Sequence, residues 1–341
     1  MMPVIGRRMV SMGMILGLVL SVACTASPAA AAPGVVRAST PRIIIDTDLS
    51  LWWDDATAIG MANVLAQHGQ LRILGIMSDI RNPLAVAALD AIDTAYGHPH
   101  IPLGAVAHSE ANTAPHGYTS DLIDKLPHSV HSSKNVSGAV ALYRQLLAGQ
   151  PDHSVTIVAI GAYTNLAGLL RSKADHHSSL NGRAMIRAKV KRLVIEDGLF
   201  PNGAPPLTNQ KLDLASAREV VNGTGWPTPI AWVDGYTGIQ TKVGGTLCTT
   251  VPSSNPMRIV YMSRFGCGPP GDGDWDGPTL LYAVSGKQQF FTELGQGGAA
   301  FLNAAGGLSW RTDPGRPHDV YVHVANQQAL KKRIDELLGA R

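Results

Sequence analysis

The chain has 341 residues, with 28 lysine and arginine residues against 25 aspartate and glutamate residues. This length is sufficient for one large α/β domain or two small ones. The nearly neutral charge balance gives no electrostatic case for binding a nucleic acid polymer or an anionic membrane surface.

The first 32 residues have the composition of a secretory signal peptide. Arg7 and Arg8 precede the apolar run Met9–Ala23, and small residues follow as far as Ala32. Because the apolar run is shorter than the ~20 residues of a membrane-spanning helix, we expect cleavage near Ala32 and a secreted, extracellular mature protein with no membrane partner. Loss of the two arginines would leave 26 basic residues against 25 acidic ones.

Two cysteines remain after this cleavage, Cys248 and Cys267. In an oxidising compartment they could form one disulfide bond, and the alternative is a pair of buried thiols. Neither arrangement is typical of a metal site, because the chain has no Cys-x-x-Cys pair.

Downstream of residues 33–40, which we expect to form a flexible leader, strand-like apolar runs alternate with helical ones. This alternation predicts one α/β domain over residues 41–341, with an open, mostly parallel sheet flanked by helices. The expected strands are Ile43–Ile45, Leu71–Met77, Val155–Ile160, Val190–Ile195 and Pro229–Val233. The expected helices include Pro83–Tyr96, Ala215–Val221 and two that begin near Ala56 and Asn165. Residues 108–135 and 266–278 are expected to be long loops.

The most informative segment is the acidic stretch that follows the first expected strand. It holds Asp46, Asp48, Asp54 and Asp55 within ten positions. In an extended chain Asp46 and Asp48 point to the same face, while an acid at a helix start is favoured by the free amides and the dipole. Four acids on one loop repel one another unless a cation lies among them, so a metal site is expected at the carboxyl end of this strand. The alternative is a solvated loop in which Asp54 is only a helix cap.

Further motifs follow the acidic stretch in a particular order. They are Leu74-Gly75-Ile76 leading into Asn82, Pro102-Leu103-Gly104, Ile157–Gly161 with Thr164-Asn165, Asn209 before Asp213, and Trp275-Asp276 before a helix. With the Asp-x-Asp and Asp-Asp-Ala patterns, this order resembles the inosine-uridine preferring nucleoside hydrolases, and more closely their divergent, secreted relatives. The resemblance runs from about Arg42 to Gly286, with a helical tail after it.

This resemblance implies a nucleoside hydrolase-like fold and a bound Ca²⁺. The implied metal ligands are Asp48, Asp55, Asp276 and the backbone carbonyl of Ile160, and hard oxygen ligands of this kind suit Ca²⁺. The ribose-binding residues that it implies are Asp54 and Asn209, with Asn82 or its neighbour Asp79 as a further ribose-facing side chain.

The implied chemistry is hydrolysis of a ribosyl N-glycosidic bond through an oxocarbenium-like ribose. A metal would lower the pKa of its bound water, and Asp48 would accept the proton as general base. We therefore expect an exported, Ca²⁺-dependent enzyme that cleaves small-molecule nucleosides to ribose and free base, as in purine and pyrimidine salvage. The preferred base, and whether the chain forms a homo-oligomer, are left open by the sequence.

Several positions depart from the pattern of this family. Leu207 and Thr208 stand where an acidic and an aromatic residue usually precede the asparagine, on the 5′ side of the ribose. The segment Glu196-Asp197-Gly198 stands where a methionine and glycines are common. Trp275 replaces a histidine that some members use near the leaving base, and is therefore a candidate substrate-binding residue.

Aromatic and histidine side chains offer further candidates for contact with the base. Trp52, Trp53 and Trp275 could stack on it, with ordinary packing as the alternative. The histidines match no zinc signature, although His108 or His116 on the long loop could approach the leaving base.

Two other functions fit parts of the sequence. Ile43–Asp48 also resembles the opening strand of haloacid dehalogenase-like phosphatases, with Asp46 as nucleophile, Asp48 as acid/base and Mg²⁺ as the metal. That interpretation leaves Asp54-Asp55-Ala56 unexplained. The second alternative is a non-catalytic nucleoside- or sugar-binding protein on the same fold, because fold alone does not settle function.

Overall fold

The computed structural model describes residues 40–50, 52–107, 117–222, 225–268 and 273–340. The expected signal peptide, residues 33–39 of the expected leader, and His108 and His116 lie outside these ranges. None of the helices within them is long and apolar enough to cross a membrane.

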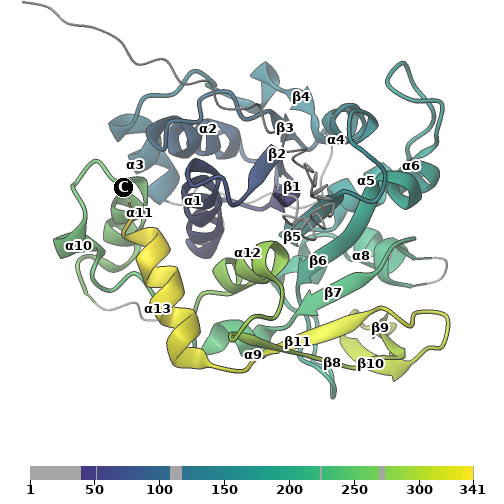
Figure 1. The fold of residues 1–341 in the computed structure, drawn as a ribbon. Helices are drawn as coiled ribbons and strands as arrows, with labels where there is room; N and C mark the ends of the chain where they lie inside the picture. Colours follow the sequence, from purple (N-terminus) through teal and green to yellow (C-terminus); the bar gives the residue numbers. More distant parts are fainter. Residues whose placement is uncertain (1–39, 51, 108–116, 223–224, 269–272, 341) are drawn as a thin grey trace, which may run out of the picture. The chain divides into compact units, whose positions relative to one another are not determined.

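Eleven strands were assigned in the described ranges, and nine of them form one sheet (Figure 1). The strands are β1 (Arg42–Thr47), β2 (Arg72–Ser78), β3 (Leu103–Ala105), β4 (Ser137–Gly138), β5 (Val155–Ile160), β6 (Val190–Glu196), β7 (Ile230–Val233), β8 (Phe291–Leu294), β9 (Gly298–Leu302), β10 (Leu308–Thr312) and β11 (Val320–Val324). The order in the large sheet is β4-β3-β2-β1-β5-β6-β7-β11-β8, and β9 pairs with β10 in a separate hairpin. All neighbouring strands of the large sheet are parallel except β11 and β8, so the expected mostly parallel sheet is confirmed.

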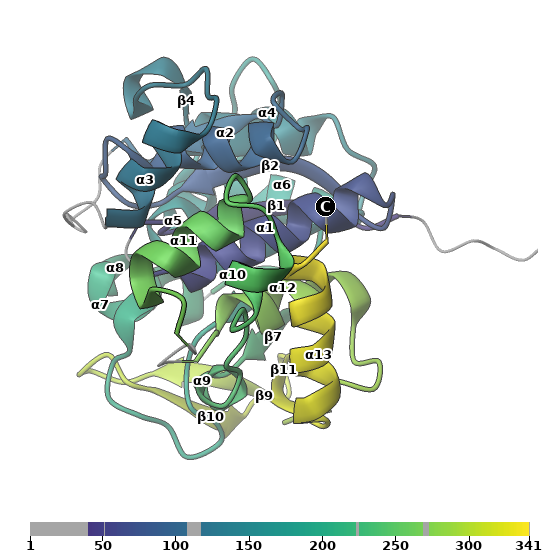
Figure 2. The ribbon, with the colours of Figure 1, turned by 90° about the vertical axis from the view of Figure 1, so that its left-hand side faces the viewer.

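Helices cover both faces of this sheet (Figures 1 and 2). They are α1 (Asp54–Gln67), α2 (Ala85–Ala95), α3 (Gly117–Lys125), α4 (Ala139–Ala148), α5 (Thr164–Arg171), α6 (Gly182–Lys189), α7 (Thr208–Leu212), α8 (Leu214–Val221), α9 (Gly235–Ile239), α10 (Leu247–Thr250), α11 (Pro256–Phe265), α12 (Asp276–Ser285) and α13 (Gln327–Leu338), with a 3-10 turn η1 (Ser133–Asn135). From Thr40 onward the chain forms one compact unit, which agrees with the single α/β domain expected from the sequence.

The isoleucine run in β1 is continuous because both faces of the strand are buried. Ile43 and Ile45 belong to a core shared with α1, α2, α11, α12 and α13. Ile44 points to the opposite face, into a core shared with α4, α5, α6 and α8. A parallel strand covered by helices on both sides is apolar at every position rather than at alternate ones.

The strand order reverses direction between β1 and β5. From β1 the chain continues outward through β2, β3 and β4, and it returns to pair β5 with the other side of β1. The carboxyl ends of β1, β5, β6 and β7 therefore lie next to one another, and ligands of open α/β sheets bind at such a switch point.

Two expectations about the later segments are wrong. Part of the expected loop over residues 108–135 is helix α3, whose buried residues Tyr118 and Leu122 lie one turn apart. The expected helical tail begins with strands β8 to β11, and only α13 at its end is helical. In β11, Val322 is fully buried between β7 and β8, so this strand extends the main sheet.

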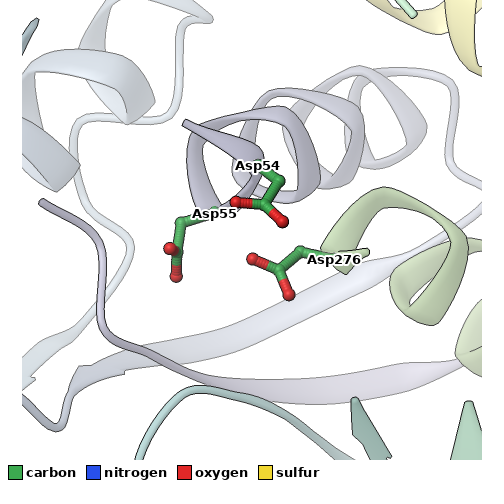
Figure 3. Close-up of side chains that lie close together, drawn as sticks. All are labelled: Asp54, Asp55 and Asp276. Carbon is green, nitrogen blue, oxygen red and sulfur yellow. The ribbon is translucent and has the colours of Figure 1, made fainter. Parts of the chain in front are cut away.

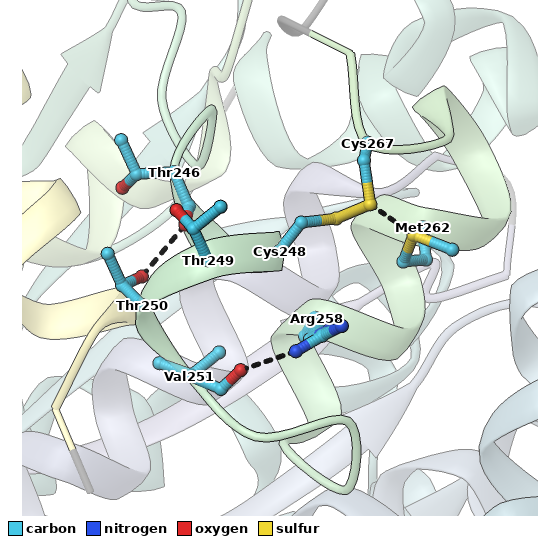
Figure 4. The surroundings of a disulfide bond; sticks show 8 residues. All are labelled: Thr246, Cys248, Thr249, Thr250, Val251, Arg258, Met262 and Cys267. Atoms are coloured by element: carbon cyan, nitrogen blue, oxygen red, sulfur yellow. Dashed lines mark hydrogen bonds between the residues drawn. A yellow bond between two sulfur atoms is a disulfide. The ribbon is translucent and has the colours of Figure 1, made fainter.

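Cys248 and Cys267 form a disulfide bond, with their Cα atoms 5.7 Å apart (Figure 4). Cys248 lies in α10, and Cys267 follows α11, where its sulfur contacts Met262. The bond therefore ties the short α10 to the end of α11, which packs against α1 and α3.

We expect the Cys248→Ser variant to unfold at a lower denaturant concentration than the unaltered protein. A bond that closes a loop of 19 residues stabilises the fold by about 3 kcal/mol, chiefly through the entropy of the unfolded chain. Denaturant unfolding followed by circular dichroism measures the difference. Cys267→Ser serves as the matched variant and should lose the same amount, and an unchanged midpoint in both would contradict the expectation.

Candidate active site

A cavity of about 310 Å³ opens at the carboxyl ends of the central strands. Its volume is in the range of small-molecule sites. Its lining residues lie at or after the ends of β1, β5 and β6, at or just before the starts of α1, α7 and α12, or within α7 and α9. They are Asp48, Trp52, Asp54, Asp55, Ile160, Glu196, Leu199, Leu207, Thr208, Asn209, Lys211, Gly235, Ile239, Trp275 and Asp276. The sheet thus gathers at one place residues that lie more than two hundred positions apart in the chain.

Three of the carboxylates that line this cavity lie close together (Figure 3). One oxygen from each of Asp54, Asp55 and Asp276 lies within 4.8 Å of the others. Asp54 and Asp55 occupy the first turn of α1, and Asp276 occupies the first turn of α12. Two helix starts therefore direct acids at one another, in the position where each helix dipole favours negative charge.

Asp48 lies beside this group and shares its electrostatic environment. Burial raises the pKa of Asp48 to about 7, against the lowering effect of a hydrogen bond with Asp55. Burial also raises the pKa of Asp55 and of Asp276 well above the usual range, and the charges of neighbouring aspartates raise both further. Without a compensating positive charge these four carboxylates oppose one another's ionisation.

Specific contacts hold the acids in place. The Thr47 hydroxyl donates a hydrogen bond to Asp55 Oδ1, and the Trp275 backbone N–H donates to Asp54 Oδ2 over 3.2 Å. Gly161 leaves room behind Asp48, since a Cβ atom there would lie 2.5 Å from both the Asp48 nitrogen and Asp79 Oδ2. These contacts restrict the movement of Asp54 and Asp55, and the backbone at Asp48 is closely packed.

This arrangement fits a hard divalent cation. Asp48 Oδ2 and Asp55 Oδ2 are buried and have no hydrogen-bond partner among the described residues. Unpartnered buried carboxylate oxygens are costly, and Ca²⁺ takes several carboxylate and carbonyl oxygens. Asp276 completes an all-oxygen donor set, and Ile160 ends β5 on the cavity wall, beside the residue that precedes Asp48.

The structure brings most of the predicted site residues to the cavity. Those that line it are Asp48, Asp54, Asp55, Ile160, Asn209, Trp275 and Asp276. The compact three-carboxylate group includes Asp54, which we predicted to bind ribose, while Asp48, a predicted metal ligand, joins it through Asp55.

Asp79 and Asn82 lie behind the cavity rather than on its wall. Both are almost fully buried. Asn82 donates a hydrogen bond to the Ser50 hydroxyl over 2.9 Å and accepts one from the Leu84 backbone. Asp79 packs behind Gly161. Their predicted contact with ribose therefore stays a prediction.

The tryptophans separate into different environments. Trp52 is 40% exposed and lines the cavity, and Trp275 lines it with its indole N–H bonded to the Gly235 carbonyl over 3.0 Å. Trp53 is buried and packs edge-on against Phe265, with ring centroids 4.9 Å apart, so it is a core residue and cannot stack on a base.

Glu196 is the main site residue that the sequence analysis did not place in the site. It ends β6 on the cavity wall and accepts a hydrogen bond from Asn209. Its position at the carboxyl end of an expected central strand was the available signal, since β1, β5 and β7 also end at the cavity.

Asp46 is placed to support the site and not to act as a nucleophile. It is fully buried and does not line the cavity. Its two oxygens accept hydrogen bonds from the Tyr143 hydroxyl at 2.8 Å and from the Asn165 amide at 2.9 Å. Because both oxygens are engaged in these contacts and are buried, Asp46 is not available as the nucleophile that a phosphatase of the haloacid dehalogenase type would need.

Comparisons with known proteins agree with this geometry. The family model described as inosine-uridine preferring nucleoside hydrolase matches residues 43–196, whereas no curated protein sequence matches the chain. Among solved structures, the chain is similar to an inosine-uridine preferring nucleoside hydrolase from Bacillus anthracis, with a TM-score of 0.66 and 14% identity over 88% of this chain and 99% of the other. It is also similar to a plant nucleoside hydrolase, PpNRh1, with a TM-score of 0.67 and 19% identity over 89% and 100% of the two chains.

A third similar structure is that of the type III effector protein XopQ in complex with adenosine diphosphate ribose. Its TM-score is 0.63, with 12% identity over 89% of this chain and 95% of the effector. At such identities the structural matches establish the fold, and the sequence match over residues 43–196 adds the acidic stretch and the first strands of the site. Residues 43–196 therefore match the inosine-uridine preferring nucleoside hydrolase family, whose members are hydrolases that act on N-glycosyl bonds, and the chain as a whole has the fold of these enzymes.

Proposed function

We propose that the protein is an exported, Ca²⁺-dependent hydrolase that cleaves the N-glycosidic bond of ribonucleosides to give ribose and a free base. The observation that carries this proposal is the convergence of Asp48, Asp54, Asp55 and Asp276 at one end of the cavity. Such a group is stable as a set of ionised carboxylates only around a cation, and the oxygen donors favour Ca²⁺.

The residues around the cavity suit the steps of this hydrolysis. A divalent cation in the carboxylate group would polarise a water molecule and orient sugar hydroxyls. Asp48, with one unpartnered oxygen, accepts a proton from the water that attacks the anomeric carbon. Asp54 and Asn209 bind ribose hydroxyls and hold that carbon in position, while the nearby carboxylates stabilise positive charge on the ring.

Other residues of the cavity suit a nucleobase. Trp52, Ile239 and Trp275 give its wall aromatic and aliphatic surface. Aromatic faces stack on any base with little discrimination, so this wall supports binding of purine and pyrimidine nucleosides alike. The products would be available for purine and pyrimidine salvage.

Export is supported by two features that are independent of the site. Residues 1–32 have the composition of a signal peptide, and Cys248 and Cys267 are disulfide-bonded. Disulfide bonds persist in oxidising compartments outside the cytosol. We propose that the mature protein begins after Ala32 and acts outside the cell.

The mature protein with Ca²⁺ should release reducing sugar from inosine, uridine, adenosine, guanosine or cytidine, and a chelator should abolish the release. Asp48→Ala should lower kcat by about 10²- to 10⁴-fold, because the general base is lost. A colorimetric reducing-sugar assay measures both effects. Unchanged turnover in Asp48→Ala would contradict the mechanism, and metal binding without turnover of any nucleoside would favour the non-catalytic binding protein.

Ca²⁺ should raise the thermal unfolding midpoint by about 5 °C or more, since a ligand that binds only the folded state stabilises it. Asp276→Asn should lose this shift without lowering the midpoint of the metal-free protein, because one mutually repelling charge is removed. Differential scanning fluorimetry checks both. The control is Asp124→Asn, at an exposed position of α3, which should keep the shift, and a full shift in Asp276→Asn would argue against the site.

Trp52→Ala should raise KM for nucleosides by about tenfold, with a smaller change in kcat, because base stacking on one aromatic ring is lost. The matched control is Tyr236→Ala, an aromatic residue that is 52% exposed but does not line the cavity. Steady-state kinetics on inosine and uridine separate the two. Equal values of KM in both variants and the unaltered enzyme would exclude stacking on Trp52.

A further inference from the structure

One wall of the cavity differs from the pattern of the family, because its carboxylate comes from another position in the chain. Leu207 lines the cavity at the position where an acidic residue is common, so position 207 supplies no carboxylate. Glu196, at the end of β6, lines the same wall and is half-buried. A carboxylate therefore reaches this wall from a strand end and not from the segment that precedes Asn209.

Glu196 fixes the orientation of the Asn209 amide. Asn209 Nδ2 donates one hydrogen bond to Glu196 Oε2 over 2.9 Å and another to the Glu196 backbone oxygen over 3.1 Å. An amide nitrogen has two N–H groups, so both are used. The reverse orientation would place Asn209 Oδ1 against two acceptor oxygens, and the network therefore leaves Oδ1 as the atom available to a ligand.

Glu196 has a second oxygen available for the same ligand. No hydrogen bond to Glu196 Oε1 occurs within the part of the chain that the structure describes. Burial raises the pKa of Glu196 well above its usual range, as do the charges of Asp197 and Asp54. Glu196 and Asp54 line the same cavity.

The neighbouring acid has a different environment, which makes it a suitable comparison. Asp197 is fully buried and does not line the cavity. Its oxygens accept hydrogen bonds from the Tyr163 hydroxyl and the Gly198 backbone, both over 2.7 Å. Consecutive residues at a strand end point to opposite sides, so only the first of this acidic pair faces a substrate.

We propose that Glu196 is a positioning residue for the ribose. It holds Asn209 with Oδ1 toward the cavity and binds a sugar hydroxyl with its own Oε1, so that these two adjacent oxygens form a hydroxyl-binding pair. This inference rests on the proposed ribonucleoside hydrolase function. The vicinal 2′- and 3′-hydroxyls suit the metal and Asp54, because one cation can bind both, and the 5′-hydroxyl is the one left for Glu196.

The test compares a ribonucleoside with its 5′-deoxy analogue in the full mature chain with Ca²⁺. Glu196→Ala should lower kcat/KM for uridine by about 10- to 100-fold, the effect of losing a hydrogen bond to a charged or buried group. With 5′-deoxyuridine the variant and the unaltered enzyme should agree within about threefold. Equal losses on both substrates, or no loss on uridine, would overturn the proposal.

Two further variants separate positioning from other roles. Glu196→Gln can still accept a hydrogen bond from Asn209 and donate one to a hydroxyl, so it should keep most of the activity on uridine. A loss as large as in Glu196→Ala would overturn the positioning role in favour of proton transfer.

Asp197→Asn is the control at the neighbouring acid. It should leave the ratio of kcat/KM for uridine to kcat/KM for 5′-deoxyuridine unchanged. A shift of that ratio as large as in Glu196→Ala would also overturn the proposal. The Ca²⁺-induced thermal shift, measured in every variant, shows that fold and metal site are retained.

Failure of the proposed function has a different signature, namely an unaltered enzyme that turns over no nucleoside. In that case calorimetric titration with uridine and 5′-deoxyuridine replaces the kinetics. Glu196→Ala should then weaken uridine binding by about 10- to 100-fold and leave 5′-deoxyuridine binding almost unchanged. Equal weakening for both ligands, or none for uridine, would overturn the role of Glu196 independently of catalysis.

Discussion

The mutual repulsion of buried carboxylates is the constraint on which the rest of this site depends. Asp48, Asp54, Asp55 and Asp276 lie together in a buried region where burial and neighbouring charge oppose their ionisation. Such a group lowers the stability of the fold unless a cation compensates it. The contacts that hold the acids, from Thr47 and the Trp275 backbone, keep this unfavourable arrangement in place and thus preserve the geometry for the cation.

The fold makes this arrangement by bringing strand ends and helix starts together. Four adjacent parallel strands end at the cavity, and α1 and α12 begin there. The strand ends supply Asp48, Ile160 and Glu196, while the helix starts supply three acids whose charge favours each helix. The groups that would bind the metal therefore come from distant parts of the chain, but they are all held by the central sheet and by two helices that begin beside it.

The wall of the cavity is where this chain departs from the pattern of the family that it resembles. An apolar residue stands at position 207, and Glu196 introduces a carboxylate from another element. Trp52 and Trp275 line the cavity and are the residues proposed to contact the base. Under the proposed function these wall residues act in substrate recognition, whereas the acids act at the anomeric carbon.

Much of the site could be predicted from local sequence. The apolar run of β1 followed by four acids predicted a strand end with a metal site, and Asp276 followed from the resemblance to a family. The central strands were predictable because strands buried on both faces are apolar throughout. Helix α3 and strands β8 to β11 were missed, since α3 has few apolar positions and each of these strands is only four or five residues long.

Other features depend on tertiary contacts that no local pattern encodes. Trp52 and Trp53 are adjacent and chemically identical, yet one lines the cavity and the other packs against Phe265. Asn82 is a polar residue after a strand, like Asp48, but it bonds to Ser50 behind the cavity. The part played by Glu196 depends on its contact with Asn209, thirteen positions away in another element.

The most direct test of the central claim is a crystal structure of the mature protein grown with Ca²⁺, with anomalous diffraction used to locate the ion. The account predicts one peak among the clustered carboxylates, with oxygens of Asp55 and Asp276 at about 2.3–2.6 Å from it. The same map would show whether Asp48 or Asp54 completes the ligand set. Absence of a peak there at saturating Ca²⁺, or a peak bound only elsewhere on the chain, would contradict the account.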